Sequence, residues 1–136
     1  DSKAAETVGT KMMKDFDVRM SSPYMPIKLL SGGNMQKLIL AREISCQPSL
    51  IIAVHPTYGL DVSAVEMVHN FLIKEQQRGC SILLISEDLD EIIALSDTIS
   101  VIFKGDLTPK RKSSDWTIED IGCAMMGVKN EIEVGA

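Results

Sequence analysis

Two short apolar runs with a long helix between them leave the chain few possible folds. Residues 50–54 and 81–86 are continuous apolar runs, the pattern of strands buried on both faces. Residues 62–78 between them carry apolar side chains at helical spacing and end at a glycine. A short acid-capped helix at 88–95 and a third strand at 98–103 follow. The order β-α-β-α-β predicts parallel strands in an α/β layered sheet.

The segments that flank this unit are predicted to add helices and a short arm. Residues 2–14 have roughly helical spacing of apolar side chains, and a loop follows them. A second helix begins at Gly33 and ends before Pro48, because proline disfavours helical backbone in the residue before it. Residues 106–112 are expected to turn back as a hairpin arm, and 116–126 to form a terminal helix.

Composition restricts the class of protein. With 136 residues, of which 45% are hydrophobic and 24% charged, the chain can form a globular domain with a core. A net charge of -5 argues against nucleic acid as a partner, because neutralising phosphates needs a basic face. The basic run at 110–112 is interpreted as a solvated turn. No apolar stretch approaches the roughly 18 residues of a membrane span, and no signal peptide is recognisable.

The cysteines indicate the redox compartment, and the first residue indicates a part of a longer chain. Three widely spaced cysteines form no Cys-x-x-Cys pair, so we expect reduced thiols in core or half-buried positions, as in cytoplasmic proteins: Cys46, Cys80 and Cys123. The chain begins with Asp rather than Met, which favours a piece of a longer protein.

A serine and two glycines stand where the second helix begins. The first amide groups of a helix have no internal partners, and the helix dipole adds partial positive charge there, so such a start can bind phosphate. Gly32 and Gly33 leave room for a ligand, and Ser31 can cap the helix while its hydroxyl faces a ligand oxygen. The alternative is an ordinary helix cap without a ligand.

Several motifs in one order identify a resemblance. They are Leu-Ser-Gly-Gly-Asn at 30–34, Pro-Thr at 56–57, Gly-Leu-Asp at 59–61 and a strand that ends in Ser86. Together they resemble the ATP-binding cassette (ABC) ATPases of membrane transporters. With the closing Ile-Glu-Asp-Ile-Gly-x-x-Met-x-Gly at 118–127, they are most similar to the C-terminal portion of the second cassette of tandem sugar or nucleoside importer ATPases.

The resemblance implies a truncated P-loop NTPase core of class α/β. It divides the chain into the end of a helical subdomain with the signature helix (1–45), the second half of a RecA-like core (46–105), and a hairpin arm with a helix (106–136). The sequence contains no Gly-x-x-x-x-Gly-Lys-Ser/Thr loop, which is therefore expected upstream of residue 1. In this class the strand of that loop lies between the strands at 81–86 and 98–103. Its loss would leave open edges, so we expect a dimer or a rearranged sheet.

Three positions depart from the pattern of active cassettes. Such cassettes carry Asp-Glu, for the magnesium shell and the attacking water, where this chain has Val54 and His55. Valine cannot ligate a metal, and a hard cation prefers oxygen to histidine nitrogen. Glu87 replaces the histidine that approaches the γ-phosphate in the family. A pairing of His55 with Glu87 as acid and base is the less favoured interpretation, and the catalytic site of this half is predicted to be degenerate.

The resemblance also implies a role in a composite ATP site. Cassettes of this family pair head to tail, so this chain would contact ATP held by another cassette through Ser31, Gly32, Gly33, Asn34 and Gln36. Asp61 would lie in the interface loop, and Gln36 and Lys37 would flank the signature helix on its exposed side. The implied cofactors are ATP and Mg²⁺. The implied partners are the second cassette, transmembrane permease subunits and, indirectly, a substrate-binding protein, on the cytoplasmic side of the membrane.

Two other functions remain open at this stage. ABC-type ATPases of DNA repair and chromosome maintenance also carry Ser-Gly-Gly signatures, although they usually keep Asp-Glu. A non-catalytic dimerisation or regulatory domain could keep the fold alone, and self-association of the 136-residue chain is a further expectation. The chain alone is expected not to hydrolyse ATP. The transported solute is not encoded in it. The departures from the family pattern at Val54, His55 and Glu87 favour nucleosides over sugars.

Overall fold

The computed structural model describes residues 2–128. The chain divides into two compact units, residues 1–83 and 84–136, which are described separately. The final residues of the predicted C-terminal arm, 129–136, lie outside the described residues. Within the described part of the chain, no helix is long and apolar enough to cross a membrane.

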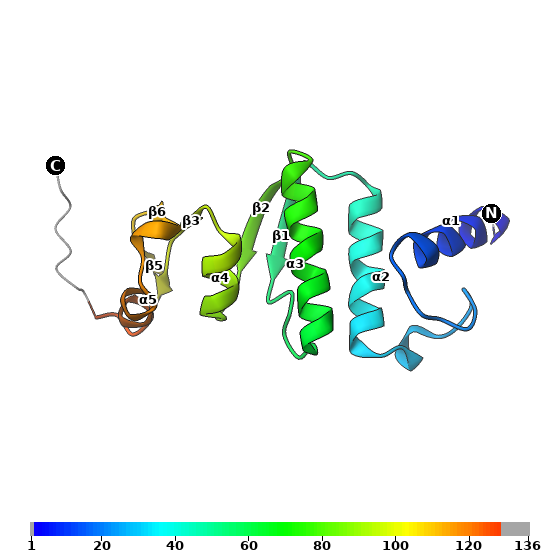
Figure 1. The fold of residues 1–136 in the computed structure, drawn as a ribbon, viewed down its shortest axis with the longest axis horizontal. Coiled ribbons are helices and arrows are strands. Elements are labelled where there is room, and N and C mark those ends of the chain that lie inside the picture. Colours follow the sequence, from blue (N-terminus) through cyan, green and yellow to red (C-terminus); the bar gives the residue numbers. More distant parts are fainter. Residues whose placement is uncertain (1, 129–136) are drawn as a thin grey trace. The chain divides into compact units, whose positions relative to one another are not determined.

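The first unit combines three long helices with a small parallel sheet (Figure 1). Its elements are α1 (Ser2–Asp15), the 3-10 turn η1 (Ile27–Leu29), α2 (Gly32–Ser45), β1 (Leu50–Val54), α3 (Val62–Gln77) and β2 (Ser81–Ile85). β1 and β2 form a two-stranded sheet, and α3 is the crossover between them. The helices α1 and α3 each pack against α2. The predicted α/β class and the positions of these helices and strands are confirmed.

Asp61 and Gly79 stop helix α3 at its two ends. The Asp61 side chain accepts a hydrogen bond from the Ala64 amide at 2.9 Å, which satisfies one of the free amides of the first turn. Gly79, at φ +94°, follows the helix, and glycine adopts this backbone without steric cost. Between these ends Val68 and Leu72 are buried, so one face of the helix forms the core of the unit.

Arg78 joins the end of α3 to the chain before β1. Arg78 Nη2 donates to Glu75 Oε2 at 2.6 Å and to the Pro48 carbonyl oxygen at 2.9 Å. The hydrogen bond to Glu75 raises the pKa of Arg78, and it gives the buried Glu75 carboxylate a partner. These contacts fix the turn from which β1 starts.

The prediction that β1 and β2 are buried on both faces is wrong, and no residue of β2 is fully buried. Leu50, Ile52 and Val54 are 54%, 60% and 56% exposed, whereas Ala53 between them is buried. Alternate residues of a strand face opposite sides, and a crossover helix covers only one side of its sheet. Within the described residues of the first unit, no layer buries the side chains on the other side of β1.

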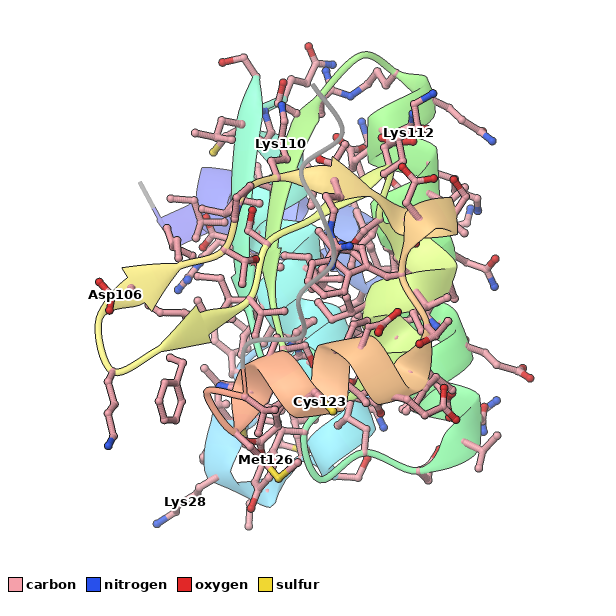
Figure 2. All side chains as sticks on the ribbon, turned by 90° about the vertical axis from the view of Figure 1, so that its left-hand side faces the viewer. Lys28, Asp106, Lys110, Lys112, Cys123 and Met126 are labelled. Carbon is pink, nitrogen blue, oxygen red and sulfur yellow. The ribbon has the colours of Figure 1, made fainter. Side chains whose placement is uncertain are left out.

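The second unit contains short strands and two helices. Its elements are α4 (Leu89–Leu95), β3 (Thr98–Ile99), β4 (Ile102–Phe103), β5 (Asp106–Leu107), β6 (Arg111–Lys112), the 3-10 turn η2 (Ser113–Asp115) and α5 (Ile118–Met125). β3 pairs antiparallel with β6, and β4 pairs antiparallel with β5. The predicted hairpin arm is therefore confirmed. Figure 2 shows Asp106 at the outer end of this hairpin, with Cys123 and Met126 at α5.

Two predictions for this unit are wrong. Residues 98–103 form two short strands rather than one, because the Thr108 side chain interrupts the ladder. The Val101 amide donates to Thr108 Oγ1 at 2.9 Å, and the Thr108 amide donates to the Val101 carbonyl oxygen at 2.9 Å. The basic run at 110–112 is not simply a solvated turn. Part of it is β6, and the Arg111 guanidinium lies 3.6 Å from the centre of the Trp116 ring.

A cluster of buried side chains holds the second unit together. It consists of Ile99, Val101, Trp116 and Ile121, with Leu89, Ile92, Ile93 and Ala124 packed against it. Thr117 and Asp120 form a reciprocal capping box that starts α5.

The three cysteines are all free, as expected. Cys46 is exposed, contrary to the prediction, because it lies in the turn after α2.

The end of α5 gives the first testable prediction. Gly127 has φ +75°, and its amide and that of Val128 bond the carbonyl oxygens of Ala124 and Cys123 at 3.0 Å, the pattern of a Schellman cap. A methyl group at Gly127 would clash with the Phe103 ring. We therefore expect Gly127→Ala to lower the free energy of unfolding by about 2–4 kcal/mol, measured by urea denaturation.

The matched control for this change is Gly122→Ala in the same helix. Gly122 lies inside α5, and a methyl group there would meet no atom within 4 Å. Alanine is the better helix former, so this variant should be as stable as the parent or more stable by about 0.5–1 kcal/mol. Equal stability of the two variants would contradict the packing of Phe103 over the α5 cap.

Candidate functional site

The start of α2, residues 31–34, presents polar groups at the surface. Ser31 and Gly32 are exposed, and the Asn34 amide donates to Ser31 Oγ at 3.4 Å, so Ser31 caps the helix as predicted. The first turn contains no acidic residue. Free amides, a hydroxyl and the positive end of the helix dipole together favour an anion at this place.

The Asn34 side chain orients the Ser31 hydroxyl. Its oxygen accepts a hydrogen bond from the Arg19 amide at 2.8 Å, which leaves its NH₂ group to donate to Ser31 Oγ at 3.0 Å. A hydroxyl that accepts in this way still has one O–H to donate. The contacts therefore prepare Ser31 as a donor to an acceptor outside the helix. Arg19 was not singled out from the sequence, because a backbone amide leaves no residue-type signal.

The two glycines of the helix start have different surroundings. A methyl group at Gly32 would come no closer than 3.9 Å to Leu60, an ordinary contact. A methyl group at Gly33 would lie 3.3 Å from the Ala64 side chain, closer than most real contacts. Gly33 therefore permits the close approach of α2 to α3, and Gly32 keeps the exposed surface free of a side chain.

The prediction that Gln36 and Lys37 lie on the exposed side of α2 is wrong. Both are half-buried and have protein partners. Gln36 Nε2 donates to the Pro56 carbonyl oxygen at 2.9 Å, and Lys37 Nζ donates to the carbonyl oxygen and to the carboxylate of Asp17, both at 3.0 Å. The hydrogen bond from Lys37 lowers the pKa of the Asp17 carboxyl below 3.8, with a smaller electrostatic contribution from the same lysine.

The loop between β1 and α3, residues 55–61, lies next to the α2 start. It contacts α2 through Pro56 and brings Leu60 to Gly32. Asp61, at the end of this loop, is exposed and caps α3. The structure thus brings Asp61's loop together with the predicted site residues 31–34.

The positions predicted to be degenerate lie at the ends of strands. Val54 ends β1 with its side chain 56% exposed, and His55 follows with φ +45°, a backbone that residues other than glycine rarely adopt. Glu87 is exposed and follows β2, in the second unit. Neither Val54 nor His55 offers a carboxylate at the end of β1. In the residues that the structure describes, no cluster of three or more histidine, cysteine or acidic side chains could hold a metal ion.

Comparison with known proteins finds relatives among import ATP-binding proteins. No protein-family model matches the chain. It is 43% identical over 116 residues to the guanosine import ATP-binding protein NupO of Bacillus subtilis, covering 85% of this chain and 23% of the relative. It is 42% identical over 117 residues to the nucleoside import ATP-binding protein NupA of Lactococcus lactis, covering 86% and 23%. The glucose import ATP-binding protein TsgD13 of Haloferax volcanii is 48% identical over 98 residues, covering 72% and 18%.

Solved structures share the fold. A nucleotide-free ATP-binding cassette of an ABC transporter superposes with a TM-score of 0.72 at 17% identity, over 91% of this chain and 50% of that one. A dimeric, post-hydrolysis cassette bound to ADP and Pi superposes with a TM-score of 0.66 at 21% identity, over 79% and 46%. This chain spans 23% of the length of the first two curated relatives. The chain therefore belongs to the ATP-binding cassette family and is homologous to part of the ATP-binding proteins of sugar and nucleoside importers.

Proposed function

We propose that this chain contributes the α2 start to an ATP site whose phosphate loop belongs to another cassette. The observation that carries the proposal is the exposed helix start at residues 31–34, where Ser31 is held as a donor and Gly32 leaves its surface open. In this role the chain would position the γ-phosphate and stabilise its charge. The dimer of a similar cassette bound to ADP and Pi supports an arrangement in pairs.

The residues of the α2 start fit a phosphate group. Its first turn has no acidic side chain, and its amides and the Ser31 hydroxyl are donors, which a phosphate oxygen requires. When bound, ATP would supply the phosphoryl group, and this chain would supply only donors and dipole. Asp61, next to Leu60 in the 55–61 loop, would face the partner cassette beside the same surface.

The residues at the end of β1 do not fit Mg²⁺. Val54 has no donor atom, and His55 offers nitrogen where a hard cation prefers oxygen. We therefore assign Mg²⁺ to the partner cassette and propose that the site of this half is degenerate. Glu87, a carboxylate in place of the family's histidine, would repel phosphate and supports the same assignment.

The full protein would then be the ATP-hydrolysing subunit of an importer, with this chain in its second cassette. Its partners would be another cassette, transmembrane permease subunits and, indirectly, a substrate-binding protein, on the cytoplasmic side of the membrane. Two of the relatives named above are nucleoside or guanosine importers and one is a glucose importer. We propose nucleosides as the cargo class, because the guanosine and nucleoside import proteins match this chain at 43% and 42% identity over 116 and 117 residues, a longer match than the 98 residues shared with the glucose import protein.

Capture of a partner cassette tests this function. The first cassette of the same protein, purified separately, should be retained by this chain several-fold more strongly with ATP than without it. Ser31→Arg should abolish the ATP-dependent part, because a bulky side chain would occupy the place of the phosphate. Ser100→Arg, at an exposed serine between β3 and β4, is the control and should behave like the parent.

Two results would contradict the proposal. Capture that is equal with and without ATP would indicate a domain that only dimerises. Steady-state ATP hydrolysis by this chain alone, well above that of Ser31→Arg, would mean that its own site is competent.

A further inference from the structure

A side-chain hydrogen bond joins α2 to the loop after β1. Gln36, half-buried in the second turn of α2, donates from Nε2 to the Pro56 carbonyl oxygen at 2.9 Å. Pro56 is buried, and the two residues are 20 positions apart in the chain. A half-buried contact of this kind orders both segments, because a buried carbonyl group without a donor costs free energy.

The loop that receives this bond also has hydrogen bonds within itself and at its end. Two turns shape it, with the Tyr58 amide bonded to the His55 carbonyl oxygen at 3.2 Å and the Leu60 amide to that of Thr57 at 3.1 Å. At its end, Asp61 caps α3. The Gln36 bond therefore fixes the beginning of the loop on α2, while the close packing of Gly33 on α3 fixes its end.

We propose that Gln36 is a positioning residue that holds the 55–61 loop against α2, so that the Ser31 hydroxyl and the Asp61 carboxylate meet a partner as one surface. This rests on the proposed function and changes the expected role of Gln36 from a contact with ATP to a contact behind the site. Its donor already bonds the protein backbone. The proposal requires of this side chain only an N–H donor that reaches the Pro56 carbonyl oxygen.

The test separates the donor from the volume of the side chain. Gln36→Met keeps the length and removes the donor, whereas Gln36→Lys keeps a donor. In the full-length protein that contains this chain, Gln36→Met should weaken binding of a non-hydrolysable ATP analogue about 3–10-fold, the usual range for one lost hydrogen bond. Amide hydrogen exchange should become faster in residues 55–60. Gln36→Lys should restore most of both, and Gln77→Met, at an exposed glutamine of α3, should change neither.

Each other outcome overturns the proposal. If Gln36→Met matches the parent in both measurements, the hydrogen bond does not hold the loop. If exchange rises but nucleotide binding stays unchanged, the bond is only structural. If Gln36→Lys fails as Gln36→Met does, shape rather than the donor matters. Ser31→Arg is measured in parallel. If Ser31→Arg abolishes nucleotide binding and Gln36→Met has no effect, only the proposed role of Gln36 fails. If Ser31→Arg has no effect, the proposed function itself is refuted.

Discussion

Gly32→Asp in the full-length protein should reduce transport and ATP-dependent cassette pairing by more than a hundredfold. The carboxylate would face the γ-phosphate at the exposed start of α2. Two unit charges about 5 Å apart repel by about 3 kcal/mol at an effective dielectric constant of about 20, and a phosphate carries more than one charge. The fold should survive, because a methyl group at Gly32 would come no closer than 3.9 Å to Leu60. Transport in reconstituted vesicles is the measurement.

Two matched variants separate charge from size in this experiment. Gly32→Asn has the shape of aspartate without its charge and should lose much less activity than Gly32→Asp. Glu87→Ala should have little effect, because Glu87 belongs to the half whose catalytic site we propose to be degenerate. A reversed result, with Glu87→Ala inactive and Gly32→Asp active, would mean that the competent site lies in the half assigned here as degenerate.

The elements of the fold were predictable from local signals. Asp61 and Asp88 each accept an amide hydrogen bond at the start of a helix, and such caps are short-range features that a sequence displays directly. The break in the strand at 98–103 was not predictable. It depends on the hydrogen bonds of Val101 with Thr108, two residues that meet only after the hairpin has formed.

The candidate site was predictable in its residues but not in its supports. Residues 31–34 stand out because Ser and Gly have specific uses at a helix start. The groups that hold them, the Arg19 amide and the Pro56 carbonyl oxygen, belong to the backbone and exist at every position of any chain. The prediction that Gln36 and Lys37 are exposed was wrong for the same reason. Both side chains donate to backbone carbonyl oxygens, and helical periodicity does not reveal such partners.

The 136-residue chain on its own should self-associate through the open side of β1. Leu50, Ile52 and Val54 are more than half exposed on that side, and Leu83 of β2 is 51% exposed. Burying half of such a side chain stabilises association by about 1 kcal/mol, so two copies gain several kcal/mol before the cost of association. Because the remaining gain is modest, we expect a dimer with a dissociation constant of about 1–100 μM, measured by light scattering and sedimentation.

Ile52→Asp should weaken this dimer by at least tenfold, because its burial would desolvate a carboxylate in each copy. Ile52 is already 60% exposed, so the change should cost the isolated fold little. Val62→Asp is the matched control. It replaces another exposed β-branched residue, 76% exposed, at the first position of α3, where aspartate suits the helix dipole. A mass of one chain at about 100 μM for the parent would refute self-association. Equal weakening by both variants would show instead that added negative charge, rather than the open side of β1, governs the association.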